Sequence, residues 1–214
     1  MAKMAVFFGV LLAAWNVGAE SKPRQVDFDL WNASAVGDHG GVKKALSRGA
    51  DVHFWDDAPL RAASHRGHAE IVGELVSAGA DIEAMGGMPL WMAAEEGHKQ
   101  VVIILLASGA NPDGWNGEPL IWSAFNGHLE IVEILVEAGA NVRIRAELAL
   151  VYAVVFGKTK VVETLLRLGA NVCVINPESA KTAELKRHIV AKQKAAKCKP
   201  YRFRPAKATQ KPVL

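Results

Sequence analysis

The middle of the chain repeats one pattern of apolar and polar positions every thirty residues. In residues 127–140 the apolar side chains fall at the i, i+1, i+4, i+5 spacing that places them on one stripe of a helix. They are Ile131, Val132, Leu135 and Val136. Gly127 precedes this segment and Gly139 follows it, and glycine is typical just past the end of a helix. The pattern predicts a short helix with one buried face in each copy.

Short sequence markers keep the same period. A Gly-Ala pair stands at residues 49–50, 79–80, 109–110, 139–140 and 169–170. Gly-His precedes the helical segment at 67–68, 97–98 and 127–128, and Gly-Lys takes its place at 157–158. Pro-Leu recurs at 59–60, 89–90 and 119–120 and becomes Ala-Leu at 149–150. Markers at one fixed period are the signature of a repeat protein.

Each copy also contains an earlier helical segment. Pro119 suits the first turn of a helix, because proline has no N–H and its φ is already helical. Leu120 and Ala124 lie four residues apart and therefore share one face. A single helix pair cannot bury both of its apolar stripes, so the copies must stack into a solenoid with a continuous core.

These markers resemble the ankyrin repeat over roughly residues 27–180. Ankyrin repeats are about 33 residues long, whereas these copies have thirty, and the difference falls between Gly-Ala and Pro-Leu. The resemblance places the β-hairpin fingers there, so short fingers are expected. In the family, a threonine precedes Pro-Leu and a histidine follows it. Here the threonine is replaced by Ala58, Met88, Glu118 and Leu148. The histidine is replaced by Arg61, Trp91, Ile121 and Val151. The predicted fold is an all-α ankyrin-repeat solenoid of about five stacked helix-turn-helix repeats, with shortened hairpin fingers and a C-terminal capping helix.

The predicted organisation has five parts. They are a signal peptide at 1–19, a lead-in at 20–26, the ankyrin repeat domain at 27–176, a capping helix at 177–198 and a basic tail at 199–214. The repeats are placed at about 27–50, 51–80, 81–110, 111–140 and 141–170. Asp27 is the predicted N-cap of the first helix. The first repeat is more polar than the others, as expected of a terminal repeat with one side in water.

Residues 1–19 have the features of a secretory signal peptide. Lys3 gives a short positive region, residues 5–15 are apolar, and Val17-Gly18-Ala19 supplies small residues for cleavage. The apolar run is too short for a membrane span, which needs about 20 residues. The alternative is an N-terminal capping helix, but residues 5–15 show no polar face. The chain is therefore expected to be exported, and to be periplasmic or secreted after cleavage following Ala19.

Charge divides the chain into an acidic body and a basic end. From Lys181 onward there are eleven lysines or arginines against one acid, Glu184. Residues 20–180 carry thirteen basic and twenty-one acidic side chains. The basic block can bind an anionic surface or an acidic partner; alternatively it is a solvated cap face, or lies against the acidic repeats of its own chain. No nucleic-acid-binding motif accompanies it, so nucleic acid is not an expected partner.

The sequence carries no recognisable catalytic motif: Gly-x-Ser-x-Gly, His-Glu-x-x-His and the phosphate-binding loop are all missing. His68, His98 and His128 lie one repeat apart, and a spacing of about 8–10 Å between stacked helices is too large for zinc bonds of about 2.0–2.1 Å. These histidines are expected to hydrogen-bond to backbone at the turns. We predict no catalytic residue, metal or cofactor, and we do not expect an enzyme.

The resemblance places candidate binding residues on the concave side of the stack, just before each Gly-His pair, and in the connectors. They are Phe54, Trp55, His65, Arg66, Met85, Glu95, Glu96, Trp115, Phe125, Asn126, Arg145 and Phe156. Tryptophan and tyrosine dominate binding hot spots, where truncation costs about 2 kcal/mol or more. The alternative is that the aromatic side chains fold over the shortened fingers and replace lost hairpin contacts.

The resemblance implies a non-enzymatic module that binds another protein. With a signal peptide, that partner is expected to be exported too. The most specific hypothesis is a self-protection protein that inhibits an exported enzyme such as a peptidoglycan hydrolase, which rests on analogy. The alternatives are a secreted effector acting inside another cell and an envelope adaptor whose basic tail binds an anionic surface. The chain alone is expected to be a monomer.

Cys173 and Cys198 are the only cysteines. Export would allow a disulfide to persist. However, one straight helix over residues 177–197 would separate its ends by about 30 Å, and a disulfide needs Cα atoms within about 7 Å. Residues 185–188 contain no glycine for a turn. The sequence therefore predicts two free thiols and one continuous helix, and a folded-back helix pair with a disulfide is the alternative.

Cleavage after Ala19 is the first testable prediction, because the positive, apolar and small-residue regions stand in the order that signal peptidases require. Mass spectrometry of the protein from its own cells should show Glu20 as the first residue. A soluble cytoplasmic protein that retains Met1 would contradict both the cleavage and the exported partner.

Overall fold

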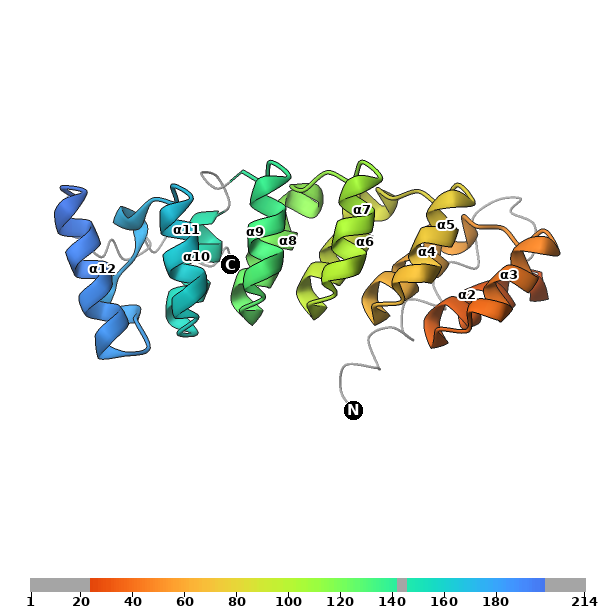
Figure 1. Ribbon diagram of the computed structural model, residues 1–214, viewed down its shortest axis with the longest axis horizontal. Helices are drawn as coiled ribbons and strands as arrows, with labels where there is room; N and C mark the ends of the chain where they lie inside the picture. Colours follow the sequence, from red (N-terminus) through yellow and green to blue (C-terminus); the bar gives the residue numbers. More distant parts are fainter. Residues whose placement is uncertain (1–23, 142–145, 199–214) are drawn as a thin grey trace, which may run out of the picture.

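The computed structural model describes residues 24–141 and 146–198, and within these ranges the chain is entirely helical, without strands. The helices form two rows along one stack (Figure 1). The inner row, whose members pack closely on one another, consists of α2 (Gln25–Val36), α4 (Phe54–Arg66), α6 (Ala84–Glu96), α8 (Gly114–Asn126) and α10 (Ala146–Val155). The outer row consists of α3 (His39–Ser47), α5 (Ala69–Ser77), α7 (Lys99–Ala107), α9 (Leu129–Glu137) and α11 (Thr159–Arg167). This arrangement confirms the predicted solenoid of stacked helix pairs.

One hydrophobic core runs the length of the stack, because each repeat contributes side chains from the same positions. The largest fully buried side chains are Leu30, Leu60, Ile71, Leu75, Leu90, Leu105, Leu120, Ile131, Leu135, Leu150, Leu165 and Ile175. Most of them are separated by multiples of thirty residues from another member of the set. No repeat could bury these residues alone, so the stability of each depends on its neighbours.

The Gly-His turns join each inner helix to its outer helix and also bridge repeats. The ring Nε2 of His98 donates to the carbonyl of His65 at 2.9 Å, and that of His128 donates to the carbonyl of Glu95 at 3.1 Å. A Cβ at Gly97 would lie 2.6 Å from the His128 ring, so the turn requires glycine for space as well as for its positive φ of 86°. The predicted backbone-bonding role of these two histidines is confirmed.

Where ankyrin-like stacks carry hairpin fingers, three consecutive repeats of this chain each make one left-handed turn. Residues 55–57, 85–87 and 115–117 all have positive φ and lie between a short helical segment and the proline of the inner helix. Trp55 (φ 49°), Met85 (φ 51°) and Trp115 (φ 48°) each begin such a turn. A non-glycine residue in this region costs about 1–2 kcal/mol, so the surrounding contacts must hold the turn in place.

A carboxylate in or just before each of these turns accepts a hydrogen bond from the backbone of the next repeat. Asp57 Oδ1 accepts from the N–H of Asp81 at 2.8 Å. In the following repeat the equivalent of Asp57 is Gly87, and Glu83, four residues earlier, accepts from the N–H of Asn111 at 2.7 Å instead. The same exchange occurs at Asp113 and Gly117, where Asp113 Oδ1 accepts from the N–H of Asn141 at 2.9 Å. An acid at either of two positions of the repeat, that of Asp57 or that of Glu83, therefore accepts from the equivalent backbone N–H of the next repeat.

Asp27 does not cap the first helix, in contrast to the sequence-based prediction. The helix begins earlier, with Arg24 as N-cap, and the buried Asp27 carboxylate accepts from the Arg24 backbone N–H at 3.0 Å and the Asp51 N–H at 2.8 Å. The Arg24 guanidinium, 2.8 Å from Asp27 Oδ1, donates to this carboxylate and lowers its pKa, with help from the backbone donors. Asp27 thus performs the inter-repeat role of Asp57.

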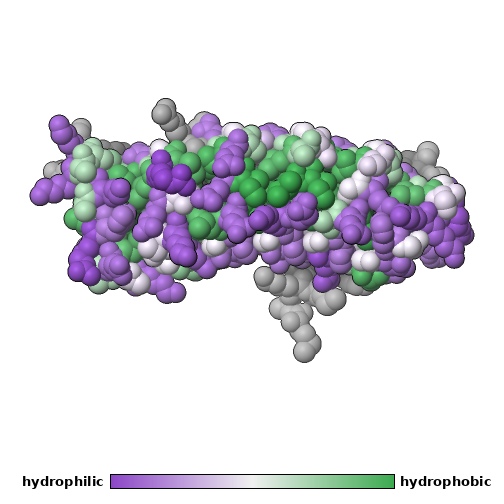
Figure 2. All heavy atoms as spheres, viewed as in Figure 1, coloured by the Kyte–Doolittle hydropathy of each residue, from purple (hydrophilic) through white to green (hydrophobic). Residues whose placement is uncertain are grey.

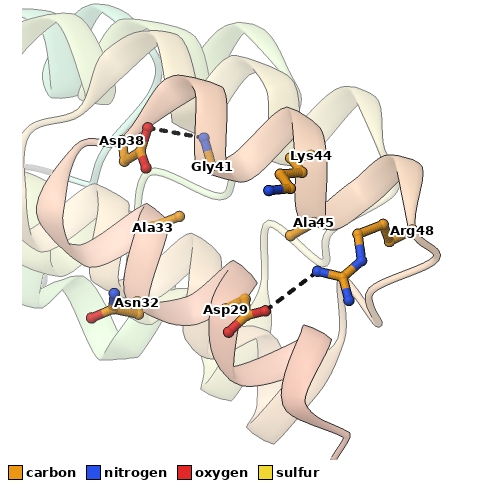
Figure 3. Close-up of a pocket in the computed structure, with 8 residues that line it drawn as sticks. All are labelled: Asp29, Asn32, Ala33, Asp38, Gly41, Lys44, Ala45 and Arg48. Carbon is orange, nitrogen blue, oxygen red and sulfur yellow. Dashed lines mark hydrogen bonds and ion pairs between the residues drawn. The ribbon is translucent and has the colours of Figure 1, made fainter.

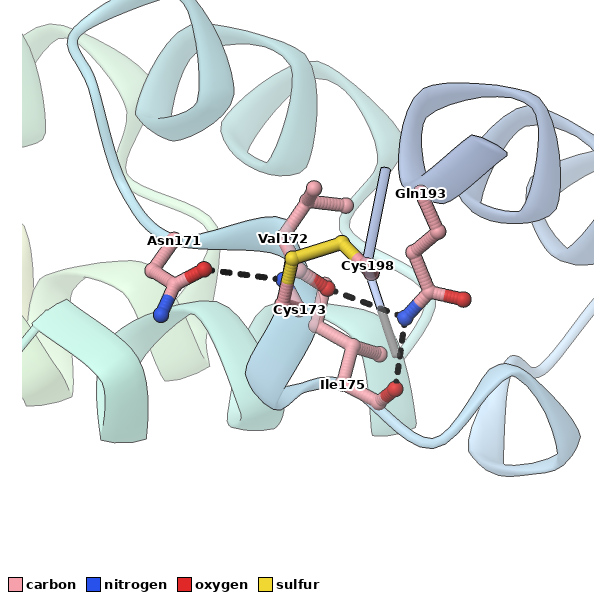
Figure 4. The surroundings of a disulfide bond; sticks show 6 residues. All are labelled: Asn171, Val172, Cys173, Ile175, Gln193 and Cys198. Atoms are coloured by element: carbon pink, nitrogen blue, oxygen red, sulfur yellow. Dashed lines mark hydrogen bonds between the residues drawn. A yellow bond between two sulfur atoms is a disulfide. The ribbon is translucent and has the colours of Figure 1, made fainter. Parts of the chain in front are cut away.

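The predicted pair of free thiols is wrong, because Cys173 and Cys198 form a disulfide with Cα atoms 5.3 Å apart (Figure 4). Cys173 lies in the short 3-10 helix η2 (Val172–Val174) directly after the last repeat, and Cys198 follows α12 (Ala183–Ala195). The disulfide therefore fastens the end of the capping helix to the stack.

The error came from the assumed length of the helix. Residues 175–182 are not part of α12; apart from the 3-10 helix η3 (Pro177–Ser179) they run away from Cys173, and α12 then returns along them. The side-chain amide of Gln193 donates to the carbonyls of Val172 at 3.0 Å and Ile175 at 2.8 Å, which holds the two segments together. The helix α12 is continuous, and it still brings Cys198 next to Cys173, because residues 175–182 first lead the chain away from Cys173.

Loss of the disulfide should loosen the capping helix. Cys198→Ser should lower the free energy of unfolding by about 2–4 kcal/mol, because the bond closes a loop of 25 residues in the unfolded chain. Chemical denaturation of the variant and the parent measures the difference. Thiol titration of the unfolded, unreduced parent should find no free thiol, and two reactive thiols per chain would contradict the structure.

A reciprocal swap tests the strain of the left-handed turns. Asp56 (φ 53°) and Gly86 (φ 77°) occupy the same place in successive repeats. Asp56→Gly should raise the free energy of unfolding by about 1 kcal/mol, and Gly86→Asp should lower it by a similar amount. A Cβ at Gly86 would meet only the Trp115 ring, at 3.8 Å, so crowding does not explain a loss there. Denaturant titrations in which both variants shift the same way would refute strain as the cause.

Candidate functional site

Aromatic side chains gather in three groups along the inner row. The first joins α2 and α4: the rings of Phe54 and Trp55 stack with centroids 4.4 Å apart, and Phe28 meets both edge-on at 5.1 Å. Trp31 lies 6.4 Å from Trp55. Trp55 and Trp31 are both exposed, with Trp55 at 41%. This group leaves two indole rings at the surface on a packed aromatic base.

The second group is a stacked pair from α6 and α8. The rings of Trp91 and Trp115 lie nearly parallel, with an angle of 9° between their planes and centroids 5.6 Å apart. Trp115 begins the left-handed turn of its repeat, so the stack supports a strained backbone. Met85, at the equivalent position one repeat earlier, is exposed. The stack is the kind of local packing that the alternative to a binding role describes, and the role of Trp115 in binding stays a prediction.

The third group joins α8 and α10 and is the most exposed. Phe125 is at its centre: its ring lies 4.4 Å from Phe156, 5.2 Å from Trp122 and 5.9 Å from Tyr152. The Trp122 indole N–H donates to Glu118 Oε2 at 2.5 Å, which fixes that ring. Phe156 and Tyr152 are 42% and 39% exposed. Exposed aromatic rings held by their neighbours are well suited to contact a partner without much loss of conformational freedom.

Polar residues lie between these groups. Arg66 and Glu96 are exposed, whereas His65 is half-buried. Burial lowers the pKa of His65, and the nearby carboxylate of Glu96 opposes that shift. The Asn126 side chain donates to the carbonyl of Glu95 at 2.7 Å and so joins α8 to α6.

Arg61 also belongs to this surface, but its guanidinium serves the turn next to it. It donates to the carbonyl of Trp55 at 2.8 Å and to the carbonyl of Asp56 at 3.0 Å. Burial lowers its pKa, although the carboxylates of Asp56 and Asp57 act in the opposite direction.

The structure sorts the predicted binding residues by accessibility. Exposed or half-exposed members on the inner row are Trp55, His65, Arg66, Met85, Glu95, Glu96, Trp115, Phe125, Asn126 and Phe156. Phe54 differs, since it is only 6% exposed and supports Trp55 from below. Arg145 lies outside the described residues. Their role in binding stays a prediction.

Sequence reasoning missed four aromatic residues of the same surface. They are Trp31, Trp91, Trp122 and Tyr152. The thirty-residue period could have found them, because Trp31 and Trp91 share one position of the repeat and Trp122 and Tyr152 share the next. These positions follow the buried leucine, but Ile121 and Met92 occupy them in other repeats and are buried, so the period alone does not show which of these side chains reach the surface.

The remaining hollows are weaker candidates for a site. One of about 270 Å³ lies between α2 and α3 (Figure 3). Its carboxylates already have partners, since Asp38 accepts from the Gly41 N–H at 2.9 Å and Asp29 lies 3.7 Å from the Arg48 guanidinium. In residues 24–141 and 146–198, no group of three or more histidine, cysteine or acidic side chains is arranged to hold a metal ion.

Comparison with known proteins agrees with the repeat architecture. The chain matches the sequence model of the family described as ankyrin repeats (3 copies) over residues 30–114 and 113–176. No curated protein matches the chain in a sequence search. Among the described residues, no helix combines the length and apolar character needed to cross a membrane. Stacked helix pairs, Gly-His turns and the sequence match together show that the chain belongs to the ankyrin-repeat family, whose members are protein–protein interaction modules.

Proposed function

We propose that this chain is an exported binding protein that holds another exported protein, most specifically an enzyme that it restrains, on the aromatic surface of its inner row. The single observation that carries the proposal is the aromatic group of Trp122, Phe125, Tyr152 and Phe156, in which Tyr152 and Phe156 are exposed and the other two are half-buried. Interfaces are enriched in aromatic side chains, and truncation of a central one costs about 2 kcal/mol or more.

The arrangement of this surface supports a protein partner over a small molecule. The three aromatic groups extend from α2 to α10, so the surface follows the length of the stack. Charged residues such as Arg66 and Glu96 separate the groups. Aromatic anchors with a polar surround are the usual anatomy of a protein interface, and ligand pockets are deeper and more enclosed.

Two observations support export. The first is the apolar leader of residues 1–19, which lies outside the described residues. The second is the Cys173–Cys198 disulfide, because disulfides persist in oxidising compartments and are rare in the cytosol. An exported module has exported partners, and a peptidoglycan hydrolase is the most specific candidate by analogy. A rigid surface bound across the cleft of such an enzyme would block its substrate.

Truncation of the third aromatic group should separate binding from stability. The partner is first captured on the mature chain from its own envelope fraction and identified. Phe156→Ala should then weaken the affinity for that partner about 30-fold, equivalent to about 2 kcal/mol. The melting temperature should change little, since Phe156 is already 42% exposed. Calorimetric titration and thermal denaturation measure the two effects.

Val190→Ala is the matched control, because Val190 is 46% exposed but lies on α12, away from the inner row. It should leave the affinity unchanged. If Phe156→Ala lowers the melting temperature by several degrees and affinity stays constant, the ring serves local packing and the proposed binding surface is wrong. Inhibition of a captured hydrolase in a cell-wall digestion assay tests the finer role.

A further inference from the structure

The capping helix α12 closes the stack and presents a basic face to solvent. From Lys181 to Lys197 the chain carries six lysines or arginines against one acid, Glu184. The helix packs through Leu185 and Ile189, which are buried, and the residues on its opposite side are exposed. In Figure 2 the α12 end of the molecule, on the left, shows hydrophilic side chains with small, weakly hydrophobic ones between them. One side of α12 therefore packs on the chain, and the other meets solvent.

The cations of the cap differ from those of the repeats in having few partners. Most cations of the repeats are held by an acid or a carbonyl, as Lys99 is by Glu130 at 2.7 Å. By contrast, the ammonium groups of Lys192, Lys194 and Lys197 have no acid or carbonyl partner among residues 24–141 and 146–198. These three side chains are free to meet an anion from outside the molecule.

The exposed side of α12 combines cations with small apolar side chains on one helical face. Its residues are Arg187, Val190, Ala191, Lys194 and Ala195. The Arg187 guanidinium donates only to the Ala183 carbonyl of its own helix, at 3.4 Å. The helix dipole favours cations in the last turn, which accounts for Lys194 but not for Arg187 in the middle of the helix. The stability of the helix therefore does not explain the whole basic face.

This face does not turn towards the acidic repeats of its own chain. The helix α12 packs on η2 and η3, and its one ion pair among the described residues joins Lys186 to Glu178 of η3. The disulfide fixes the end of α12 in this position. Residues 24–141 carry seven basic and seventeen acidic side chains, so charge is divided along the stack. An anionic surface would attract the α12 end and repel the remainder of the stack.

We propose that the exposed face of α12 binds the surface of an anionic phospholipid bilayer and holds the stack end-on. Each basic side chain next to such a surface strengthens binding about fivefold. Val190 and the two alanines allow the helix to approach the headgroups closely. The proposal does not depend on the inner-row function, because it uses a different surface and leaves the aromatic groups free.

The composition of the face argues against the other occupants. Sites for single-stranded nucleic acid add aromatic rings on which bases stack, and base readout in duplexes uses amide or guanidinium groups in a groove. The face of α12 has no aromatic ring, and its one amide, Gln193, is bonded to the carbonyls of Val172 and Ile175. A protein interface has a larger apolar centre than one valine and two alanines provide.

Co-sedimentation of the mature chain, residues 20–214, with vesicles tests the proposal. The vesicles are phosphatidylcholine with about 30% phosphatidylglycerol, which gives an anionic surface. The double variant Arg187→Gln/Lys194→Gln should bind them about 30-fold more weakly, because two cations leave the face. Raising the salt concentration from about 0.1 M to about 1 M should abolish binding of the parent, since the Debye length falls from about 10 Å to about 3 Å.

A matched variant removes the same charge from the opposite end of the stack. Lys43→Gln/Lys44→Gln changes two exposed lysines of α3 and should bind the vesicles as the parent does. Circular dichroism melting verifies that both double variants fold. Phe156→Ala should not affect the vesicles, and the α12 variant should not affect a captured partner, so failure of this proposal is distinguishable from failure of the inner-row site.

Four results would overturn the proposal. The first is equal binding of the parent to anionic vesicles and to vesicles of phosphatidylcholine alone. The second is unchanged binding of the α12 variant, which would place the contact outside this face. The third is an equal loss in the α3 variant, which would reduce the effect to net charge. The fourth is binding of a short DNA duplex, weakened by the α12 variant, without binding of the vesicles, which would assign the face to nucleic acid.

Discussion

The stack depends on one hydrogen bond that recurs at four successive junctions: a carboxylate of one repeat accepts from the first backbone N–H of the next connector. In longer repeats of this family a hairpin finger provides backbone contacts between neighbours. Here three residues in the left-handed region replace the finger, and their strain is acceptable only because the bond fixes the turn against the following repeat. Aromatic stacking, as between Trp91 and Trp115, adds a second tie at the same place.

The two rows of helices divide the tasks of the molecule. The inner row combines the close packing between repeats with the exposed aromatic groups, so the residues proposed to contact a partner are also residues that join neighbouring repeats, as Phe125 does between α8 and α10. The outer row is more widely spaced. Its helix α7 differs from the equivalent helices in having Ile103 where they have lysine, glycine or glutamate, so the repeats serve as internal controls for one another.

Much of the fold could be predicted because a fixed period reports on packing directly: a leucine every thirty residues must lie in the same layer, and a glycine before each histidine must end a helix. The sequence could not reveal events that depend on the path of the chain between elements. The Cys173–Cys198 disulfide required knowing that residues 175–182 run antiparallel to α12. The role of Asp27 required knowing where Asp51 lies in space. For the candidate site, the period placed Phe125 and Phe156 on one surface, but which rings touch depends on rotamers that no pattern specifies.

The exchange of the carboxylate between two positions links those positions sterically. Asp57 has His53 four residues before it, whereas Glu83 has Gly87 four residues after it. A Cβ at Gly87 would lie 3.3 Å from the Glu83 carboxylate and 3.0 Å from the Gly114 backbone, so both positions cannot easily carry acids at once. A repeat that changes from one arrangement to the other must pass through a form with two crowded acids or with none. In repeats of this length, an aspartate at the position of Asp57 and an acid at the position of Glu83 should therefore exclude each other. The identity of this pair would then mark which repeats of such an array arose from one another by duplication.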